Sequence, residues 1–133
     1  MPAADHPHAP VIHLDTNFLI DALVPGSPQE ARLVAWLSAG DLLGISAVAW
    51  GEFLCEPLSS SAEVLARELL PVAEPLTRSD AEYAAQLFNF TGRRSKSYAD
   101  CCIAAVAVRE KAMVATSNVT DFEPFTAQGL QLA

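Results

Sequence analysis

Short apolar runs alternate along this chain with longer stretches in which apolar residues recur at helical spacing. The clearest short run, residues 11–14, ends at an aspartate and has the length and character of a buried strand. A later apolar run, residues 72–76, contains Pro75. It is therefore predicted to be an edge strand or a short strand, because proline donates no hydrogen bond to a sheet. The five predicted strands are 11–14, 42–45, 72–76, 113–116 and 129–132.

Helical stretches separate these strands, and several begin with residues that cap helices. Ser27 and Pro28 followed by Glu30 predict a capping box with proline in the first turn, and Gly40 predicts the end of that helix. Segment 98–111 is apolar on nearly every side, which is typical of a helix buried in the middle of a domain. The predicted helix starts are Asp15 or Thr16, Ser27, Ser46, Ser60, Thr77 and Tyr98.

Strands that alternate with helices predict an α/β fold with a parallel sheet in a three-layered arrangement. Residues 1–10 contain three prolines and no periodicity, so we expect a flexible tail there. No internal repeat or linker interrupts the rest of the chain, so residues 11–133 are predicted to form a single domain.

Composition narrows the class of protein. Of 133 residues, 51% are hydrophobic, which is enough for a packed core. The longest apolar run, 101–108, is too short to cross a bilayer, and no basic region followed by an apolar run marks a signal peptide. We therefore expect a cytoplasmic protein without a membrane segment. The three cysteines form no C-x-x-C pair, so neither a zinc nor a disulfide framework is indicated.

The net charge of −8 argues against a protein that simply coats nucleic acid, because such proteins are basic. An acidic chain can still cut nucleic acid if its carboxylates hold divalent cations, since the bound ions reverse the local field. The charge therefore argues against a passive nucleic-acid binder more than against a nuclease.

Four acidic residues lie at the edges of apolar segments. Asp15 follows the first strand, Glu52 lies on the helix after the second, Asp100 lies in the first turn of the apolar helix, and Asp121 follows the fourth strand by a short loop. Ligands of parallel sheets bind beyond the carboxyl ends of the strands, where these residues would gather. Carboxylates that share a pocket repel one another, and Mg²⁺ or Mn²⁺ resolves the repulsion because hard cations prefer oxygen ligands.

Each acid also has an ordinary structural interpretation. Asp15 and Asp121 are suited to cap helices, and Asp100 suits the first turn of a helix. Glu52 has the usual character of a solvated helix residue. One such acid is weak evidence for a site, whereas four of them beside apolar segments favour a metal-binding cluster.

Four segments resemble the motifs of PIN domains, in the order of that family. They are Leu14-Asp15-Thr16-Asn17 after the first strand, Ser46 followed six residues later by Glu52, 98–105 (YADCCIAA), and 115–122 (ATSNVTDF). The match extends over roughly residues 11–132, and the chain's size looks most like the VapC-type toxins of toxin–antitoxin pairs.

The resemblance implies a central parallel sheet of about five strands with helices on both faces. It implies Mg²⁺- or Mn²⁺-dependent endoribonuclease activity on RNA such as tRNA or rRNA, inhibition by a cognate antitoxin protein, and a homodimer. By the same resemblance, the candidate catalytic and metal-binding residues are Asp15, Glu52, Asp100 and Asp121, with Asn118 as a further candidate ligand.

Around these residues we expect a layer of supporting side chains. Hydroxyl and amide groups next to the acids would orient the carboxylates, and the basic segment near the third motif would steer RNA phosphates. The supporting candidates are Thr16, Asn17, Ser46 and Thr116, and the steering candidates are Arg93, Arg94 and Lys96.

Two other functions remain open at this point. A metal-dependent phosphatase would use Asp15 as a nucleophile, although Asn17 stands where that chemistry usually needs a second acid. A degenerate domain of this family would only bind a protein partner. Apolar faces on the predicted helices at 61–70 and 79–90 favour the homodimer, and His6, His8 and His13 form a weaker candidate metal cluster.

Overall fold

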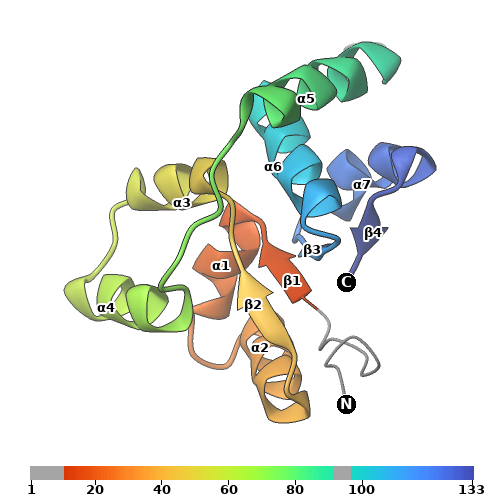
Figure 1. Cartoon of the computed structure of the whole chain (residues 1–133). Coiled ribbons are helices and arrows are strands. Elements are labelled where there is room, and N and C mark those ends of the chain that lie inside the picture. Colours follow the sequence, from red (N-terminus) through yellow and green to blue (C-terminus); the bar gives the residue numbers. More distant parts are fainter. Residues whose placement is uncertain (1–10, 92–96) are drawn as a thin grey trace, which may run out of the picture.

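The computed structural model describes residues 11–91 and 97–133, which form a four-stranded parallel sheet surrounded by helices (Figure 1). The strand order is β2-β1-β3-β4, so the first strand is central. Every paired strand is parallel, as predicted. The strands are β1 (Val11–Leu14), β2 (Leu42–Gly44), β3 (Met113–Ala115) and β4 (Gln131–Leu132).

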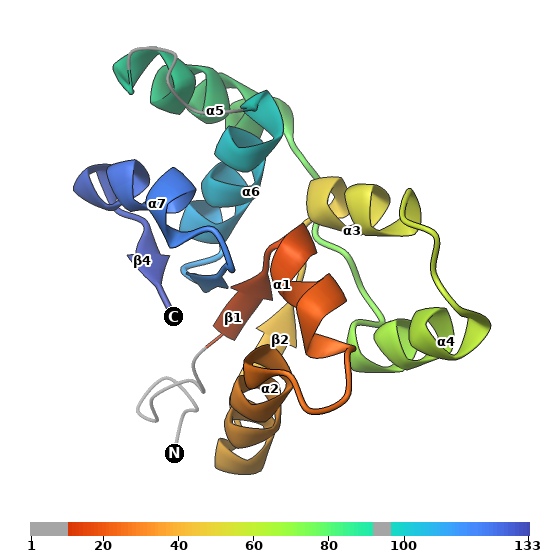
Figure 2. The ribbon, with the colours of Figure 1, turned by 180° about the vertical axis from the view of Figure 1, so that it is seen from behind.

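Helices flank this sheet, which confirms the predicted three-layer α/β fold. The first four helices lie toward the β2 side of the sheet and the later ones toward β3 and β4, in both the front and the rear view (Figures 1 and 2). They are α1 (Thr16–Ala22), α2 (Pro28–Ala39), α3 (Ala47–Leu54), α4 (Ser60–Leu69), α5 (Arg78–Phe90), α6 (Tyr98–Arg109) and α7 (Val119–Phe122), followed by the 3₁₀ helix η2 (Glu123–Gln128).

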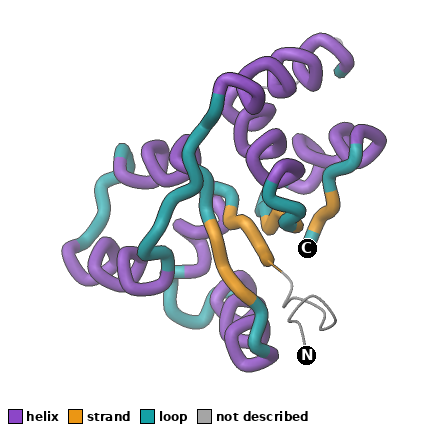
Figure 3. Tube along the Cα trace, in the orientation of Figure 1, coloured by secondary structure: helices purple, strands orange, loops and turns teal. Residues whose placement is uncertain are grey.

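The strand predicted at 72–76 is wrong, and the described part of the chain therefore has four strands rather than five. Figure 3 shows this segment as a loop between α4 and α5. Only Glu74 pairs with the sheet region: its N–H donates to Ile45 O over 2.8 Å, and its carbonyl accepts from Ala47 N over 2.7 Å. Pro75 follows directly and has no N–H to donate, so the pairing ends after one residue.

The capping residues explain where most helices begin. Ser27 caps α2, and Gly40 ends it with φ 85°, a conformation that glycine adopts without strain. The predicted box at Ser27 is not closed, because the Glu30 carboxylate accepts from Gly26 N instead. The cap of α4 is Ser59, one residue earlier than predicted. The box formed by Thr77 and Asp80 at the start of α5 is present.

The core is built around α6 and β1. Residues 101–107 of α6 are all buried, as the pattern of that helix predicts. His13 of β1 is only 2% exposed, and its ring packs so closely against Gly44 that a Cβ there would lie 2.8 Å from Cδ2. Burial lowers the pKa of His13, and its Nδ1 has no hydrogen-bond partner. His13 is therefore a core residue, while His6 and His8 lie outside the described residues.

In the described ranges, 11–91 and 97–133, no helix combines the length and hydrophobicity needed to cross a membrane.

Candidate active site

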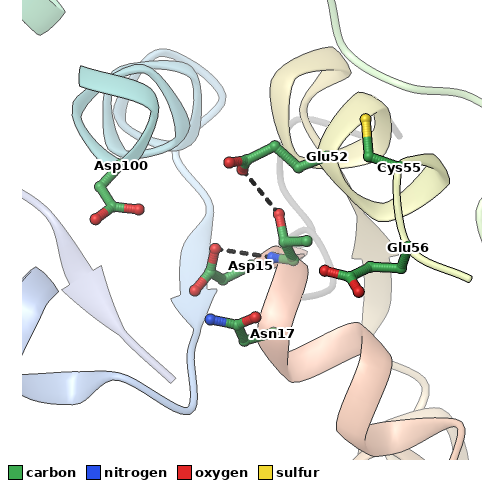
Figure 4. A pocket seen from close by; sticks show the side chains of 7 residues that line it. Asp15, Asn17, Glu52, Cys55, Glu56 and Asp100 are labelled. Atoms are coloured by element: carbon green, nitrogen blue, oxygen red, sulfur yellow. Dashed lines mark hydrogen bonds between the residues drawn. The ribbon is translucent and has the colours of Figure 1, made fainter. Parts of the chain in front are cut away.

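Three predicted site carboxylates face one pocket, and each comes from a different element (Figure 4). Asp15 follows β1 and caps α1, Glu52 lies in the last turns of α3, and Asp100 lies in the first turn of α6. The pocket has a volume of about 380 Å³. It is lined by Asp15, Thr16, Asn17, Glu52, Cys55, Glu56 and Asp100.

Asp15 is the most buried of these acids, at 4% exposure. Its Oδ1 accepts from the backbone N–H of Thr16 over 2.8 Å, and its Oδ2 accepts from the Thr116 hydroxyl over 2.9 Å. Burial raises the pKa of Asp15, the hydrogen bonds from Thr116 and Thr16 oppose that rise, and the charges of Glu52 and Asp121 add to it. Hydrogen bonds therefore hold both Asp15 oxygens in one orientation, although burial disfavours the charged form of this carboxylate.

Asp100 shows the crowding of charge most clearly. Its pKa rises to about 6, first because of burial and then because of the carboxylates of Asp15, Asp121 and Glu52, while a hydrogen bond from Ser97 lowers it. A divalent cation in this pocket would favour the ionised form of each acid and remove the repulsion between them.

Thr16 connects Asp15 to Glu52. Its backbone N–H binds Asp15, and its hydroxyl donates to Glu52 Oε1 over 3.0 Å and lies 3.3 Å from Ala49 O. The same residue therefore binds two of the carboxylates and holds them in fixed directions.

Asp121 and Asn118 occupy different positions relative to the carboxylates. Asp121 lies within α7 and is close enough to raise the pKa of both Asp15 and Asp100, although it does not line the pocket. Asn118 is the N-cap residue of α7, and its backbone N–H donates to the Thr116 hydroxyl over 2.9 Å. Asp121 therefore acts on the carboxylate cluster through its charge. Asn118 is connected to the cluster only through the hydroxyl of Thr116, which binds Asp15.

The remaining candidate residues also differ in whether they line the pocket. Asn17 lines the pocket directly. Ser46 does not, but its hydroxyl accepts from Ala49 N over 3.1 Å and so fixes the start of α3, the helix that carries Glu52. The predicted steering residues Arg93, Arg94 and Lys96 lie outside the described residues.

Two lining residues were missed by sequence reasoning, Cys55 and Glu56. Glu56 carried a usable signal, because it follows Glu52 by four residues and such pairs share one side of a helix. Cys55 carried none, since a thiol at the end of a helix is not distinctive by itself.

The donor set suits a hard divalent cation. In the described ranges, no three His, Cys, Asp or Glu side chains meet closely enough to enclose an ion by themselves. Mg²⁺ usually keeps several of its waters and takes only one or two carboxylates directly. Carboxylates spread around an open pocket, with repulsion expressed in the raised pKa of Asp100, therefore fit a partly hydrated ion.

Comparison with known proteins shows the family to which the chain belongs. The model of the PIN domain family matches residues 12–123, and the chain belongs to that family. No curated protein sequence matches the chain.

The solved structures that are similar to this chain include VapBC2, FitAcB and VapC20. The chain is 17% identical to VapBC2 from Rickettsia felis, solved bound to a DNA fragment from its promoter, with a TM-score of 0.72 and coverage of 92% of this chain and 97% of that one. FitAcB from Neisseria gonorrhoeae is 27% identical, with a TM-score of 0.67 and coverage of 92% and 96%. VapC20 of Mycobacterium tuberculosis, a sarcin–ricin loop cleaving toxin, is 18% identical, with a TM-score of 0.66 and coverage of 92% and 98%.

Proposed function

We propose that this chain is a metal-dependent endoribonuclease and the toxin of a toxin–antitoxin pair, acting through one nuclease domain at residues 11–133. The observation that carries the proposal is the convergence of Asp15, Glu52 and Asp100 on one open pocket, with a pKa of about 6 at Asp100. The similar VapC20 is described as a toxin that cleaves an RNA loop, which supports an RNA substrate, such as rRNA or tRNA, for this chain too.

In this proposal Asp15, Glu52 and Asp100 hold Mg²⁺ or Mn²⁺, and Asp121 supports the same cluster. When bound there, such an ion would lower the pKa of a nearby water and would offset negative charge on the phosphate. The Thr116 hydroxyl keeps Asp15 Oδ2 in one orientation, and the Thr16 hydroxyl does the same for Glu52 Oε1. Asp15 would bind through oxygens already aligned by these hydrogen bonds, which lowers the cost of organising the site.

A cognate antitoxin is the proposed partner. None of the seven residues that line the pocket is basic, and four are acidic. A partner that placed Arg or Lys in this pocket would replace the cation and complement the net charge of −8. A similar solved structure is a toxin–antitoxin complex from Klebsiella pneumoniae, which supports a partner of this kind.

The test is cleavage of total cellular RNA by the purified chain in Mg²⁺, in Mn²⁺ and in EDTA. We expect discrete fragments that disappear in EDTA and in the Asp100→Ala variant. Glu68→Gln is the matched control, because Glu68 is an exposed acid on α4 that does not line the pocket. Intact RNA in all conditions, from folded chain free of antitoxin, would refute the ribonuclease function. Release of phosphate from small esters in the same samples would instead indicate a phosphatase.

A further inference from the structure

The loop between β3 and α7, residues 116–118, is bonded to α1 and its N-cap at two separate points. At the N-cap of α1, the Thr116 hydroxyl donates to Asp15 Oδ2 over 2.9 Å. In the last turn of α1, Asp21 Oδ2 accepts from the Ser117 hydroxyl over 2.8 Å. A segment attached at one point can turn about it, whereas two separated attachments fix its direction. The bond between Asp21 and Ser117 therefore sets how this loop runs along α1.

The short helix that follows the loop depends on such contacts for its orientation. α7 has four residues, and its N-cap residue Asn118 makes no side-chain capping bond. A helix of one turn is not stable by itself, so tertiary contacts orient it. At its far end Phe122 is buried and packs edge-on against Phe125. At its near end the loop supports it, because Asn118 N donates to the Thr116 hydroxyl and Asp121 N donates to Asn118 O.

We infer that Asp21 and Ser117 are positioning residues of the proposed active site. Their hydrogen bond holds the β3–α7 loop, and through the loop it keeps Thr116 on Asp15 and Asp121 beside the carboxylate cluster. Neither Asp21 nor Ser117 lines the pocket, so they act on the site through the loop rather than by touching a cation or RNA there. A carboxylate acceptor makes a stronger bond with a hydroxyl than a neutral acceptor does, which suits it to this role. The inference rests on the cation site of the proposed function.

The exposure of this bond separates its effect on the site from its effect on the fold. An exposed hydrogen bond adds little to the free energy of unfolding, because water replaces either partner. Without it, α7 is still held by the burial of Phe122, and the loop is still bonded to Asp15. Its removal should therefore leave the chain folded while Asp121 gains a wider range of positions, which weakens cation binding.

The test measures Mn²⁺ binding by the whole chain, from the rise in melting temperature in a Mn²⁺ titration and from the EPR signal of free Mn²⁺. We expect Asp21→Ala and Ser117→Ala each to bind Mn²⁺ about 5-fold more weakly, within the range for one net hydrogen bond. The double variant should lose no more than either single variant, because both changes remove the same bond. Ser117→Thr keeps the hydroxyl and should bind Mn²⁺ as the parent does.

Glu63→Ala is the matched control. It removes another exposed pair, in which Arg67 Nε donates to Glu63 Oε2 over 3.1 Å on α4. We expect unchanged Mn²⁺ binding in this variant, and in EDTA a free energy of unfolding close to that of the parent in all of these variants.

Two results would overturn the inference. Mn²⁺ binding equal to that of the parent in both alanine variants would remove the positioning role. Weaker binding in Asp21→Ala but not in Ser117→Ala would show that Asp21 acts on the cation through its charge alone.

Cleavage of total RNA by the same samples keeps the two proposals apart. If the parent binds Mn²⁺ and cleaves RNA while the alanine variants match it in both, only the positioning role fails. If the alanine variants bind Mn²⁺ more weakly than the parent but no sample cleaves RNA, the ribonuclease function fails while the positioning of the cation site stands.

Discussion

Asp100 has a pKa of about 6 and therefore loses its proton close to physiological pH. In the unfolded chain the same group ionises near its ordinary value of 3.8. Between these two values the folded state binds more protons than the unfolded state, so the metal-free fold loses stability as pH rises from about 4 to about 6. Above that window the full penalty of the charged carboxylate is present, unless a cation offsets it.

Replacing Asp100 by Asn should therefore stabilise the metal-free chain at pH 8, where the parent carries the charged form. We expect a gain on the order of 1–2 kcal/mol, since two pKa units correspond to somewhat more than this before solvent screening is allowed for. Denaturant unfolding in EDTA at pH 8 and at pH 4 measures the effect. A gain that is equal at both pH values would contradict its electrostatic origin. With saturating Mn²⁺ the order should reverse, because the variant has lost a ligand.

Thr116→Val should weaken the site by releasing Asp15 Oδ2. The hydroxyl donates to that oxygen over 2.9 Å and holds the pKa of Asp15 down, so its removal raises this pKa further. We expect cleavage near neutral pH to fall about 10-fold or more, as for other groups that orient metal ligands, with the acid limb of the pH–rate profile moved to higher pH. Thr116→Ser keeps the hydroxyl and is the control. An unshifted profile in the valine variant would show that Thr116 acts only through packing.

At the scale of elements, one ion pair fixes the junction between α5 and α6. Arg109 Nε lies 3.0 Å from both Asp80 oxygens, and another guanidinium nitrogen donates to Pro75 O over 2.8 Å. Burial alone would raise the pKa of Asp80, but hydrogen bonds from Thr77 and Arg109 hold it below its ordinary value. The stability gained is present at neutral pH and is lost as pH falls below about 4, where the carboxylate becomes protonated.

Asp80→Asn should destabilise the fold by about 1–3 kcal/mol at pH 7. The change removes the charge opposite Arg109, whose side chain is only 34% exposed, and weakens the capping box of α5. Glu82→Gln on the same helix is the control, because its contact with Arg78 is exposed and 3.9 Å long. Urea unfolding at pH 7 and at pH 3 tests the charge: the loss should shrink at the lower pH. A loss equal to that of Glu82→Gln would contradict the assigned role of the pair.

The sequence predicts well those elements whose signals are local. The strand ending at Asp15, the cap at Thr77 and the glycine at position 40 each carry the information in a few adjacent residues. The run at 72–76 has strand composition but forms a single bridge at Glu74, because its pairing depends on the distant Ser46 and ends at a proline. The composition of a segment does not show whether a distant part of the chain lies in position to pair with it.

The candidate site also contains residues with a local sequence signal and residues without one. Its acids were predictable from motifs, since each lies next to a strand or helix end recognisable in the sequence. Asn17 was also among the predicted residues, and Glu56 could have been found from its spacing to Glu52. Cys55 could not, because it joins the other lining residues around one pocket only after α1 and α3 have packed together. Similarly, the choice between Asn118 and Asp121 depends on the direction in which α7 leaves β3. The structure links Asp121 to the charges of Asp15 and Asp100.

At the scale of the whole molecule, α4 and α5 leave apolar side chains in solvent. Val64 is 56% exposed, Leu65 45% and Phe90 63%. We propose that part of these two separate faces forms a homodimer interface, since exposed apolar surface commonly marks association sites. We expect light scattering to give twice the chain mass, and Val64→Glu to shift the mass toward one chain. Val24→Glu, an exposed apolar position between α1 and α2, is the control. A monomer at high protein concentration would refute the interface.

The packing of His13 against Gly44 restricts the order in which substitutions can accumulate in this fold. Any side chain at position 44 of β2 would lie 2.8 Å from a ring that is itself buried on β1. Gly44→Ala alone should therefore cost about 1–3 kcal/mol through overpacking, whereas the same change after His13→Ala should cost much less. Denaturant unfolding of the two single variants and the double variant measures this coupling. Additive effects would contradict it. An evolutionary path that enlarges residue 44 is therefore less costly for descendants in which residue 13 has already become smaller.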